Sequence, residues 1–212
     1  MVNNKIHWLY CELCQEHGDP KLLWPQWCAL RKTARDREKI IIGAILTQHT
    51  SWHNANLALQ NLKQAKLLSL QALAQKQNYK KMAVCLKPAG FHTTKPKRLY
   101  GLAQFIIRQG GLKELMGRET ARAREELLAL YGIGQETADT ILLYGLGKLS
   151  FVIDEYTKRL VLKHKLSRVY TYDYLKQLFE KGLPKSIKIY QDFHALIIIE
   201  QKGRTSSKME RI

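Results

Sequence analysis

Two glycines that bracket one isoleucine, between two segments of helical periodicity, constrain the fold of this chain more than any other feature. The stretch reads LYGIGQETAD from Leu130 to Asp139. Glycine permits a positive φ, and it has no side chain that would keep a ligand from the backbone. Ile133 can fill the angle between two helices. The N–H groups of the turn and of the next helix's first turn are then available to an anion. The pattern predicts a helical hairpin that binds a DNA phosphate without reading base sequence, although an ordinary αα-turn with a glycine cap has the same pattern.

Helical periodicity extends over almost the whole chain. Residues 40–46 form a run too apolar for a surface helix, so this segment should be central. Segments 52–68 and 97–108 alternate apolar and polar residues at helical spacing, and another helix should start at Thr120. Only Leu149–Ile153 resembles a strand, and we interpret it as a buried extended connection. The sequence therefore predicts an all-α fold.

The charge balance points to a polyanionic partner. The chain has 35 lysines and arginines against 18 aspartates and glutamates, which gives a formal net charge of +17. Nucleic acid or an acidic membrane surface would both attract such a chain. No segment is basic on one helical face and strongly apolar on the other, which favours nucleic acid. No apolar run approaches the ~18 residues of a membrane span and no signal peptide is evident, so we expect a cytoplasmic, nucleoid-associated protein without a membrane partner.

The cysteines give a weaker signal. Cys11 and Cys14 have CxxC spacing, which raises metal or redox chemistry. No second CxxC or histidine pair follows at the spacing of a zinc site, and the surrounding residues have helical periodicity. We therefore expect two thiols on a helix and no bound metal, with a metal or redox protein as a distant alternative.

One aspartate stands where an apolar connection meets a basic helix. Asp154 follows residues 149–153 and precedes Lys158 and Arg159. Aspartate is a common helix N-cap, and a capping carboxylate is held rigidly by backbone donors. The same carboxylate could stabilise an oxocarbenium-like sugar and orient or deprotonate a water, as carboxylates do in glycosidases. From spacing alone, both the capping and the catalytic interpretations stay open.

Taken together, the motifs resemble the helix-hairpin-helix (HhH-GPD) DNA glycosylases of the endonuclease III superfamily. The hairpin followed by Val152–Asp154, the segment Ile45–Thr50 and the loop Gly90–Leu99 occur in the family's order, and the resemblance spans about residues 38–162. It implies a two-lobed all-helical fold with a cleft between the lobes. A six-helix barrel would comprise residues 34–150, with the hairpin at about 120–146, and residues 1–33 plus 151–212 would form the second lobe.

The resemblance also implies roles for individual residues. Asp154 matches the catalytic aspartate, and Gln48 matches the glutamine that fills the gap left by an extruded base. Phe91 or His92 falls where a wedge residue enters the DNA. An internally satisfied Gln48 and a plain loop role for Phe91 and His92 stay open. The residues expected to bind DNA are Gly132, Ile133, Gly134, Gln135, Thr137, Gln48, Phe91, His92 and Lys95.

Two departures from the family pattern narrow the chemistry. Members that also cut the strand carry a lysine in the second hairpin helix, and this position is Glu136 here. A carboxylate cannot form an imine, so we expect a monofunctional enzyme. No cysteine follows Cys85, so the four-cysteine iron–sulfur cluster of many relatives is not expected. No other cofactor is implied, although a monovalent cation at the hairpin stays open.

In both departures, the sequence resembles the 3-methyladenine branch of the superfamily. Trp24-Pro25 echoes a tryptophan–proline of that branch, and Trp27 lies close by. An alkylated purine is cationic, so an aromatic face in the base pocket would attract it. Core packing is the alternative for both tryptophans. His194 and Glu200 could face the cleft, although a structural role is the commoner outcome for such a histidine.

The sequence thus predicts a monomeric, monofunctional glycosylase that acts on alkylated purines in double-stranded DNA. A bifunctional glycosylase and lyase is the nearest alternative. A catalytically silent hairpin module that only binds DNA is an alternative from another class.

Overall fold

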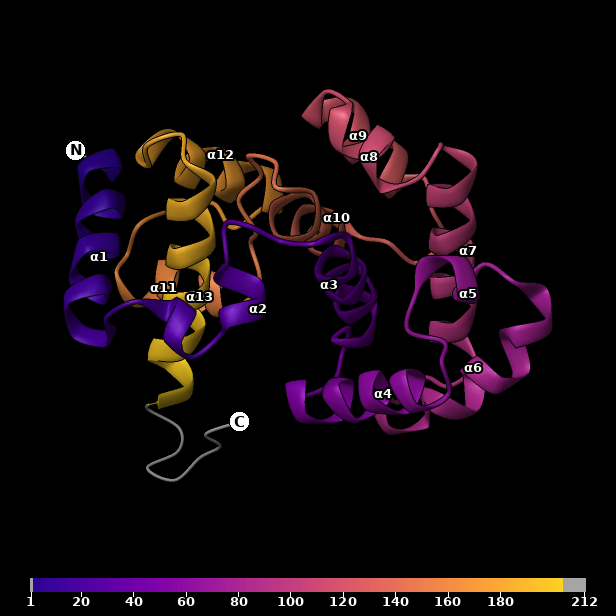
Figure 1. Ribbon diagram of the computed structural model, residues 1–212. Helices are drawn as coiled ribbons and strands as arrows, with labels where there is room; N and C mark the ends of the chain where they lie inside the picture. Colours follow the sequence, from indigo (N-terminus) through magenta and orange to yellow (C-terminus); the bar gives the residue numbers. More distant parts are fainter. Residues whose placement is uncertain (1, 204–212) are drawn as a thin grey trace. The chain divides into compact units, whose positions relative to one another are not determined.

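The computed structural model describes residues 2–203, in which all regular elements are helices and there is no β-strand (Figure 1). The all-α prediction is therefore confirmed. The helices, in chain order, are α1 (Val2–His17), η1 (Pro20–Leu22), α2 (Pro25–Cys28), α3 (Ala34–Leu46), α4 (Trp52–Gln64), α5 (Leu70–Leu73), η2 (Lys76–Asn78), α6 (Tyr79–Cys85), η3 (Lys87–Ala89), α7 (Thr94–Arg108), α8 (Leu112–Gly117), α9 (Thr120–Leu128), α10 (Gln135–Thr140), the π-helix η4 (Ile141–Leu146), α11 (Glu155–Lys163), α12 (Tyr172–Gly182) and α13 (Ile187–Gly203).

The chain divides into two compact units, which we describe separately. The middle unit comprises residues 32–147. The terminal unit combines residues from 1–31 and 148–212. The hairpin lies in the middle unit, and Asp154 lies in the terminal unit.

The middle unit is built around α3. This helix begins with a reciprocal capping box, in which Thr33 and Asp36 each bind the other's backbone N–H. Its segment Ile40–Leu46 is buried, as the sequence predicted. The segment packs on η4, where a Cβ on Gly145 would lie 2.8 Å from Cγ1 of Ile41. The close approach of these two helices therefore depends on the absence of a side chain at position 145.

The terminal unit has an aromatic core. Figure 1 shows α1 alongside α13, and these two helices pack directly on each other. The Phe151 and Phe179 rings stack with centroids 4.8 Å apart, and Phe193 contacts both. The connection that carries Phe151 is extended and buried from Ser150 onward, and Ser150 Oγ accepts a hydrogen bond of 2.7 Å from Lys176 Nζ. The predicted buried connection is thus confirmed for residues 150–153, whereas Leu149, its first residue, is 38% exposed.

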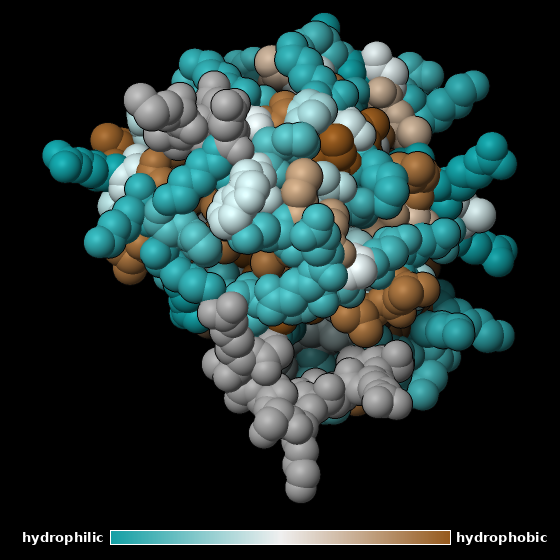
Figure 2. Space-filling view, turned by 90° about the vertical axis from the view of Figure 1, so that its left-hand side faces the viewer, coloured by the Kyte–Doolittle hydropathy of each residue, from teal (hydrophilic) through white to brown (hydrophobic). Residues whose placement is uncertain are grey.

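The surface carries the hydrophilic side chains. Figure 2 shows a face covered mainly by hydrophilic residues, with hydrophobic ones gathered in small groups. Such scattered apolar residues are normal on protein surfaces. Among residues 2–203, no helix combines the length and the hydrophobicity that crossing a membrane requires.

Candidate functional site

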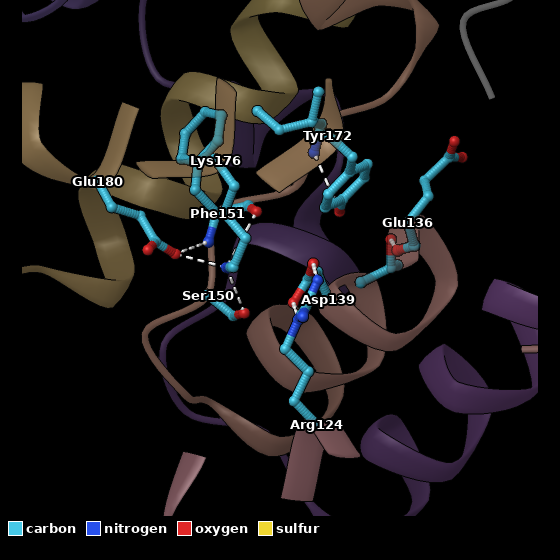
Figure 3. Close-up of polar contacts among 10 residues, drawn as sticks. Arg124, Glu136, Asp139, Ser150, Phe151, Tyr172, Lys176 and Glu180 are labelled. Carbon is cyan, nitrogen blue, oxygen red and sulfur yellow. Dashed lines mark hydrogen bonds and ion pairs between the residues drawn. The ribbon is translucent and has the colours of Figure 1, made fainter. Parts of the chain in front are cut away.

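The backbone that leads to Asp154 is fixed by side chains of α12, and Figure 3 shows these contacts. The Phe151 N–H donates to Glu180 Oε1 at 2.9 Å. The Ile153 N–H donates to the Tyr172 hydroxyl at 3.4 Å. Because no sheet supplies partners for this extended segment, α12 satisfies its backbone donors instead. The position of Asp154 is thereby set before α11 begins.

Asp154 is the N-cap of α11, and its two carboxylate oxygens have different partners. Oδ1 accepts hydrogen bonds from the Thr157 N–H at 2.7 Å and from the Thr157 hydroxyl at 2.9 Å. Oδ2 lies 3.3 Å from Nε2 of His194 on α13. Asp154 is only 9% exposed. The capping interpretation is therefore correct, and it leaves Oδ2 as the oxygen that can act on a substrate.

The surroundings of Asp154 keep it ionised. Burial raises the pKa of this carboxyl, but the charge and hydrogen bond of His194 and the two donors of Thr157 act in the opposite direction and prevail. The net effect is a pKa below the ordinary value for aspartate. At neutral pH the site therefore holds a desolvated negative charge, which suits it to stabilise a developing cation.

The hairpin in the middle unit differs from the prediction in two details. Helix α9 already ends at Leu128, two residues before the stretch that begins at Leu130, and turns lead to Gly132. The Ile133 N–H donates to the Leu130 carbonyl at 3.2 Å, so this N–H is not available to an anion. The Ile133 side chain is 5% exposed and belongs to the hydrophobic core. Ile133 therefore fills the angle between the helices, and its buried side chain is not available to a ligand.

The two hairpin glycines serve different purposes. Gly132 has φ +77°, which is the left-handed region that favours glycine. Gly134 has φ −90°, so the expected need for a positive φ holds only at position 132. A Cβ on Gly134 would meet nothing within 4 Å, and no side chain caps α10. The open backbone at Gly134 and at the start of α10 is thus where a phosphate oxygen could approach.

Gln48 is bonded to the hairpin. Its Nε2 donates to the Gly132 carbonyl at 3.0 Å and to the Thr137 hydroxyl at 2.9 Å. Its Oε1 accepts from Arg98 Nη1 at 2.6 Å. The alternative of an internally satisfied glutamine therefore describes Gln48 in this structure. A cation at the hairpin would have to share the Gly132 carbonyl with this amide.

Two basic residues of α7 flank the hairpin, and the sequence reasoning did not single them out. Arg98 binds Gln48 and lies so close to Gly132 that a Cβ there would be 2.1 Å from its Nε. Lys97 Nζ lies 4.3 Å from the ring centroid of the exposed Tyr131. The sequence has basic residues at positions 95, 97 and 98, but only the orientation of α7 shows which of them lie beside the hairpin.

Lys95 requires a correction. The prediction placed it among the residues that bind DNA, but its side chain is 0% exposed. Its ammonium donates to the Leu46 carbonyl and to the Ala89 carbonyl, both at 2.7 Å. Burial, together with the nearby charge of Arg98, lowers the pKa of Lys95 to about 8. Lys95 therefore caps the ends of α3 and η3 from inside and does not reach a phosphate.

The loop at Phe91 presents aromatic side chains to solvent. Phe91 is 57% exposed, and its ring centroid lies 6.0 Å from that of His49. Both residues have left-handed backbones, with φ 47° and 51°, which non-glycine residues rarely adopt and which often mark functional sites. His92 is exposed as well. His49 is a further candidate contact to DNA. The sequence motif at residues 45–50 did not distinguish it from the residues around it.

The tryptophans of the proposed base pocket are half-buried. Trp24 is the N-cap residue of α2, and α2 packs against α13. Lys202 Nζ lies 5.7 Å from the centroid of the Trp24 ring. Trp27 is also half-buried. Trp24 thus already holds one cation near its ring, which is the interaction expected for a cationic base.

A buried ion pair holds the two hairpin helices together, as Figure 3 also shows. Asp139 of α10 is fully buried, and it accepts from Arg124 Nε at 2.9 Å and from Nη2 at 3.1 Å. Glu136, one turn earlier on α10, is exposed. The residue at the position of the missing lysine is therefore accessible to solvent.

Three side chains at the ends of α1 and α13 have donor atoms close enough together to bind a metal ion. Donor atoms of Glu16, His17 and Glu200 lie within 4.8 Å of one another. Glu200 accepts from His17 at 3.0 Å, and Lys163 Nζ lies 3.3 Å from its other oxygen. These contacts already neutralise Glu200, so the group is an ion-pair cluster at the ends of α1 and α13. Cys11 and Cys14 lie on helix α1, as expected, with one thiol exposed and the other half-buried.

Comparisons with known proteins agree with this geometry. The profile of the HhH-GPD superfamily base excision DNA repair proteins matches residues 42–185. The chain belongs to this superfamily. A protein of Methanocaldococcus jannaschii that bears the name of a candidate DNA repair glycosylase is 42% identical, over 93% of this chain and 89% of the relative. The endonuclease III of Thermotoga maritima is 24% identical, over 72% of this chain and 68% of the relative.

Solved structures give the same fold. The crystal structure of the H. pylori 3-methyladenine DNA glycosylase bound to 1,N6-ethenoadenine has a TM-score of 0.70 and 29% identity, over 87% of this chain and 96% of that one. A non-covalent endonuclease III–DNA complex has a TM-score of 0.72 and 14% identity, over 100% of this chain and 91% of that one. The family match and the 42% identical relative make the chain a DNA glycosylase of base excision repair, with DNA as its partner.

Proposed function

We propose that this glycosylase is monofunctional and hydrolyses the N-glycosidic bond of alkylated purines of the 3-methyladenine type in double-stranded DNA. The observation that carries the proposal is the buried, ionised Asp154 at the start of α11. The likeness to the H. pylori 3-methyladenine enzyme, at 29% identity, supports the substrate class. Glu136, at the position where strand-cutting members carry a lysine, supports hydrolysis by water without an imine.

In the proposed reaction, the bond between C1′ and the base nitrogen breaks and its electron pair leaves with the base. A base that was cationic thereby becomes neutral, so it needs little further activation. The sugar acquires oxocarbenium character, which the charge of Asp154 Oδ2 stabilises. Water then attacks C1′ and gives up a proton to Asp154 or to solvent, which leaves an abasic site. Asp154 thus acts as electrostatic stabiliser and general base.

The DNA-binding part of the proposal rests on the middle unit. The uncapped start of α10 at Gly134, Gln135 and Thr137 would hold a phosphate. Phe91, with His49 beside it, is the aromatic side chain that would enter the stack when the base is extruded. His92 stays a second candidate for this wedge. Gln48 would have to release its bonds to the hairpin before it could fill the vacated position.

Release of free bases from methylated DNA, resolved by chromatography, tests the substrate class. We expect 3-methyladenine to appear in a time-dependent manner with the wild-type protein. Release of an oxidised or deaminated base from other DNA, with none from methylated DNA, would overturn the substrate class and leave the glycosylase assignment intact.

Trp24 provides a test of the base pocket. We expect Trp24→Leu to lower kcat/KM for 3-methyladenine release about tenfold, because a desolvated cation–π interaction contributes about 1–2 kcal/mol. Trp24→Phe should retain most of the activity. Trp8→Leu is the matched control, since Trp8 is an exposed tryptophan of the same unit. Equal rates for Trp24→Leu and Trp8→Leu would remove Trp24 from the pocket.

Borohydride trapping on abasic DNA tests the absence of lyase chemistry. We expect no covalent adduct with the wild-type protein, because Glu136 stands at the position of the lysine and because Lys95, whose pKa is lowered to about 8, has its ammonium sealed inside the fold. Glu136→Lys is the informative variant, because it places an amine on the exposed face of α10. Trapping of the wild-type protein would establish the bifunctional alternative. Trapping of Glu136→Lys alone would show that the site lacks only an amine at position 136 to form an imine with the sugar.

A further inference from the structure

The contacts of Asp154 single out a second residue of the same site. His194 lies on α13, 40 residues after Asp154 in the chain. Its Nε2 is 3.3 Å from Asp154 Oδ2, the oxygen that Thr157 does not bind. The residue is buried, with 6% exposure. A buried imidazole therefore faces the one carboxylate oxygen that the proposed reaction uses.

The orientation of this imidazole is set by its packing. Its ring meets the Phe151 ring edge to face, with centroids 6.4 Å apart and planes at 89°. Phe151 is itself held by its backbone bond to Glu180 and by its stack on Phe179. The residue that precedes Asp154 by three positions thus also fixes the ring that faces Asp154. This arrangement is the usual way in which an active carboxylate is held in one rotamer.

We propose that His194 is a positioning residue for the glycosylase reaction, which aims Oδ2 of Asp154 at the sugar and keeps this oxygen negatively charged. The inference rests on the proposed role of Asp154 and names the residue that completes that site. Thr157 holds one oxygen, and His194 holds the other through Nε2. Without His194, the carboxylate keeps its N-cap bonds but loses the contact that defines the direction and the charge of Oδ2.

His194 is also the titratable group that faces the carboxylate. Burial raises the pKa of Asp154, and the charge of His194 is the largest of the influences that lower it. Removal of the imidazole should therefore raise the pKa of Asp154, so that the carboxylate becomes protonated at a higher pH. The titratable side chains on the neighbouring elements have other partners: Glu155 with Lys158 on α11, Tyr172 of α12 with the Ile153 N–H, Asp192 with Lys188 on α13, and Glu200 with His17 and Lys163.

The test uses two DNA duplexes that do not depend on the identity of the damaged base. One carries a neutral tetrahydrofuran abasic analogue, and the other carries a cationic pyrrolidine analogue that places a positive charge where the sugar would develop it. The ratio of the two affinities reports the charge that the protein presents to the sugar. We expect the wild-type protein to prefer the cationic duplex, and we expect this preference to fall as acid protonates Asp154.

His194→Ala should reduce the preference for the cationic duplex about tenfold or more, since the loss of one partner of a buried charged contact such as that of Nε2 with Oδ2, at 3.3 Å, costs at least a factor of this size. The pH at which the preference disappears should also rise. In His194→Gln, the side chain can still donate to Oδ2 but carries no charge. This variant should keep most of the preference near neutral pH. The pH below which the preference is lost (the acid limb) should rise as it does in the alanine variant. This variant carries the test if the alanine variant does not fold.

Gln201→Ala is the matched control. Gln201 Nε2 donates to the Tyr156 carbonyl at 2.6 Å, so this change removes another contact between α13 and α11 without touching Asp154. It should lower thermal stability and leave the ratio of affinities unchanged. If His194 had a purely structural role, the His194 variants would give the same result as Gln201→Ala. The affinities for both duplexes would fall together, and the pH at which the preference is lost would not change.

The Asp154→Asn protein separates the two hypotheses. If this variant keeps the preference for the cationic duplex, the proposed role of Asp154 is wrong and the role of His194 fails with it. If it loses the preference while both His194 variants keep the wild-type ratio and acid limb, only the inference about His194 is overturned.

Discussion

Replacement of Asp154 with asparagine is expected to reduce the single-turnover rate of base release about 10³-fold, which is the range for loss of a preorganised charge or a general base. Asparagine has the same shape and can still accept from the Thr157 N–H, so α11 keeps its N-cap. The change therefore removes the negative charge that His194 and the Thr157 donors sustain against the burial of the site, and it leaves the fold in place. Rates measured with enzyme in excess over methylated DNA would report the chemical step.

Glu155→Gln is the matched control for this prediction. Glu155 is the adjacent carboxylate, but its side chain is 66% exposed and pairs with Lys158 and Arg159 on the surface of α11. Its neutralisation should change the rate less than about twofold, because surface ion pairs contribute little. An Asp154→Asn protein that releases bases at the rate of the Glu155→Gln control would remove Asp154 from the reaction.

The sequence predicted those parts of the site that depend on local pattern. The start of α9 at Thr120, the buried 40–46 segment and the extended connection before Asp154 follow from periodicity and from glycine or aspartate at defined positions. The role of Ile133 between the helices could also be predicted, because an apolar residue between two glycines has no other place to be buried. These features require only neighbours in the chain.

The sequence could not predict contacts between distant segments. Lys95 and Lys97 have the same charge and lie two positions apart, yet the helical turn of α7 buries Lys95 and leaves Lys97 exposed beside Tyr131. His194 lies 40 residues beyond Asp154, and only the packing of α13 on α11 brings the two side chains together. The left-handed backbone of Phe91 likewise has no signature in the residue type.

Replacement of Gly132 with alanine is expected to have the largest effect on stability. The residue has φ +77°, and an added Cβ would lie 2.1 Å from Arg98 Nε and 2.6 Å from its Cδ. The left-handed backbone costs about 1–2 kcal/mol for a residue with a Cβ, and overpacking adds about 1–3 kcal/mol. We therefore expect the free energy of unfolding to fall by about 3 kcal/mol. Urea unfolding followed by circular dichroism measures this change.

Gly134→Ala is the matched control, because the same methyl group is added two residues away under opposite conditions. Position 134 has φ −90° and open space around the added Cβ, so stability should change by less than about 0.5 kcal/mol, as for an unconstrained surface change. DNA affinity should nevertheless fall, since the methyl group would stand where the phosphate approaches.

In the Gly132→Ala background, Arg98→Ala should restore the part of the stability that is lost to the clash with Arg98. The cost of the left-handed backbone should remain. Equal stability losses in both glycine variants would show that the hairpin tolerates no side chain at either position, and would remove the distinction between a conformational glycine at 132 and a phosphate-facing glycine at 134.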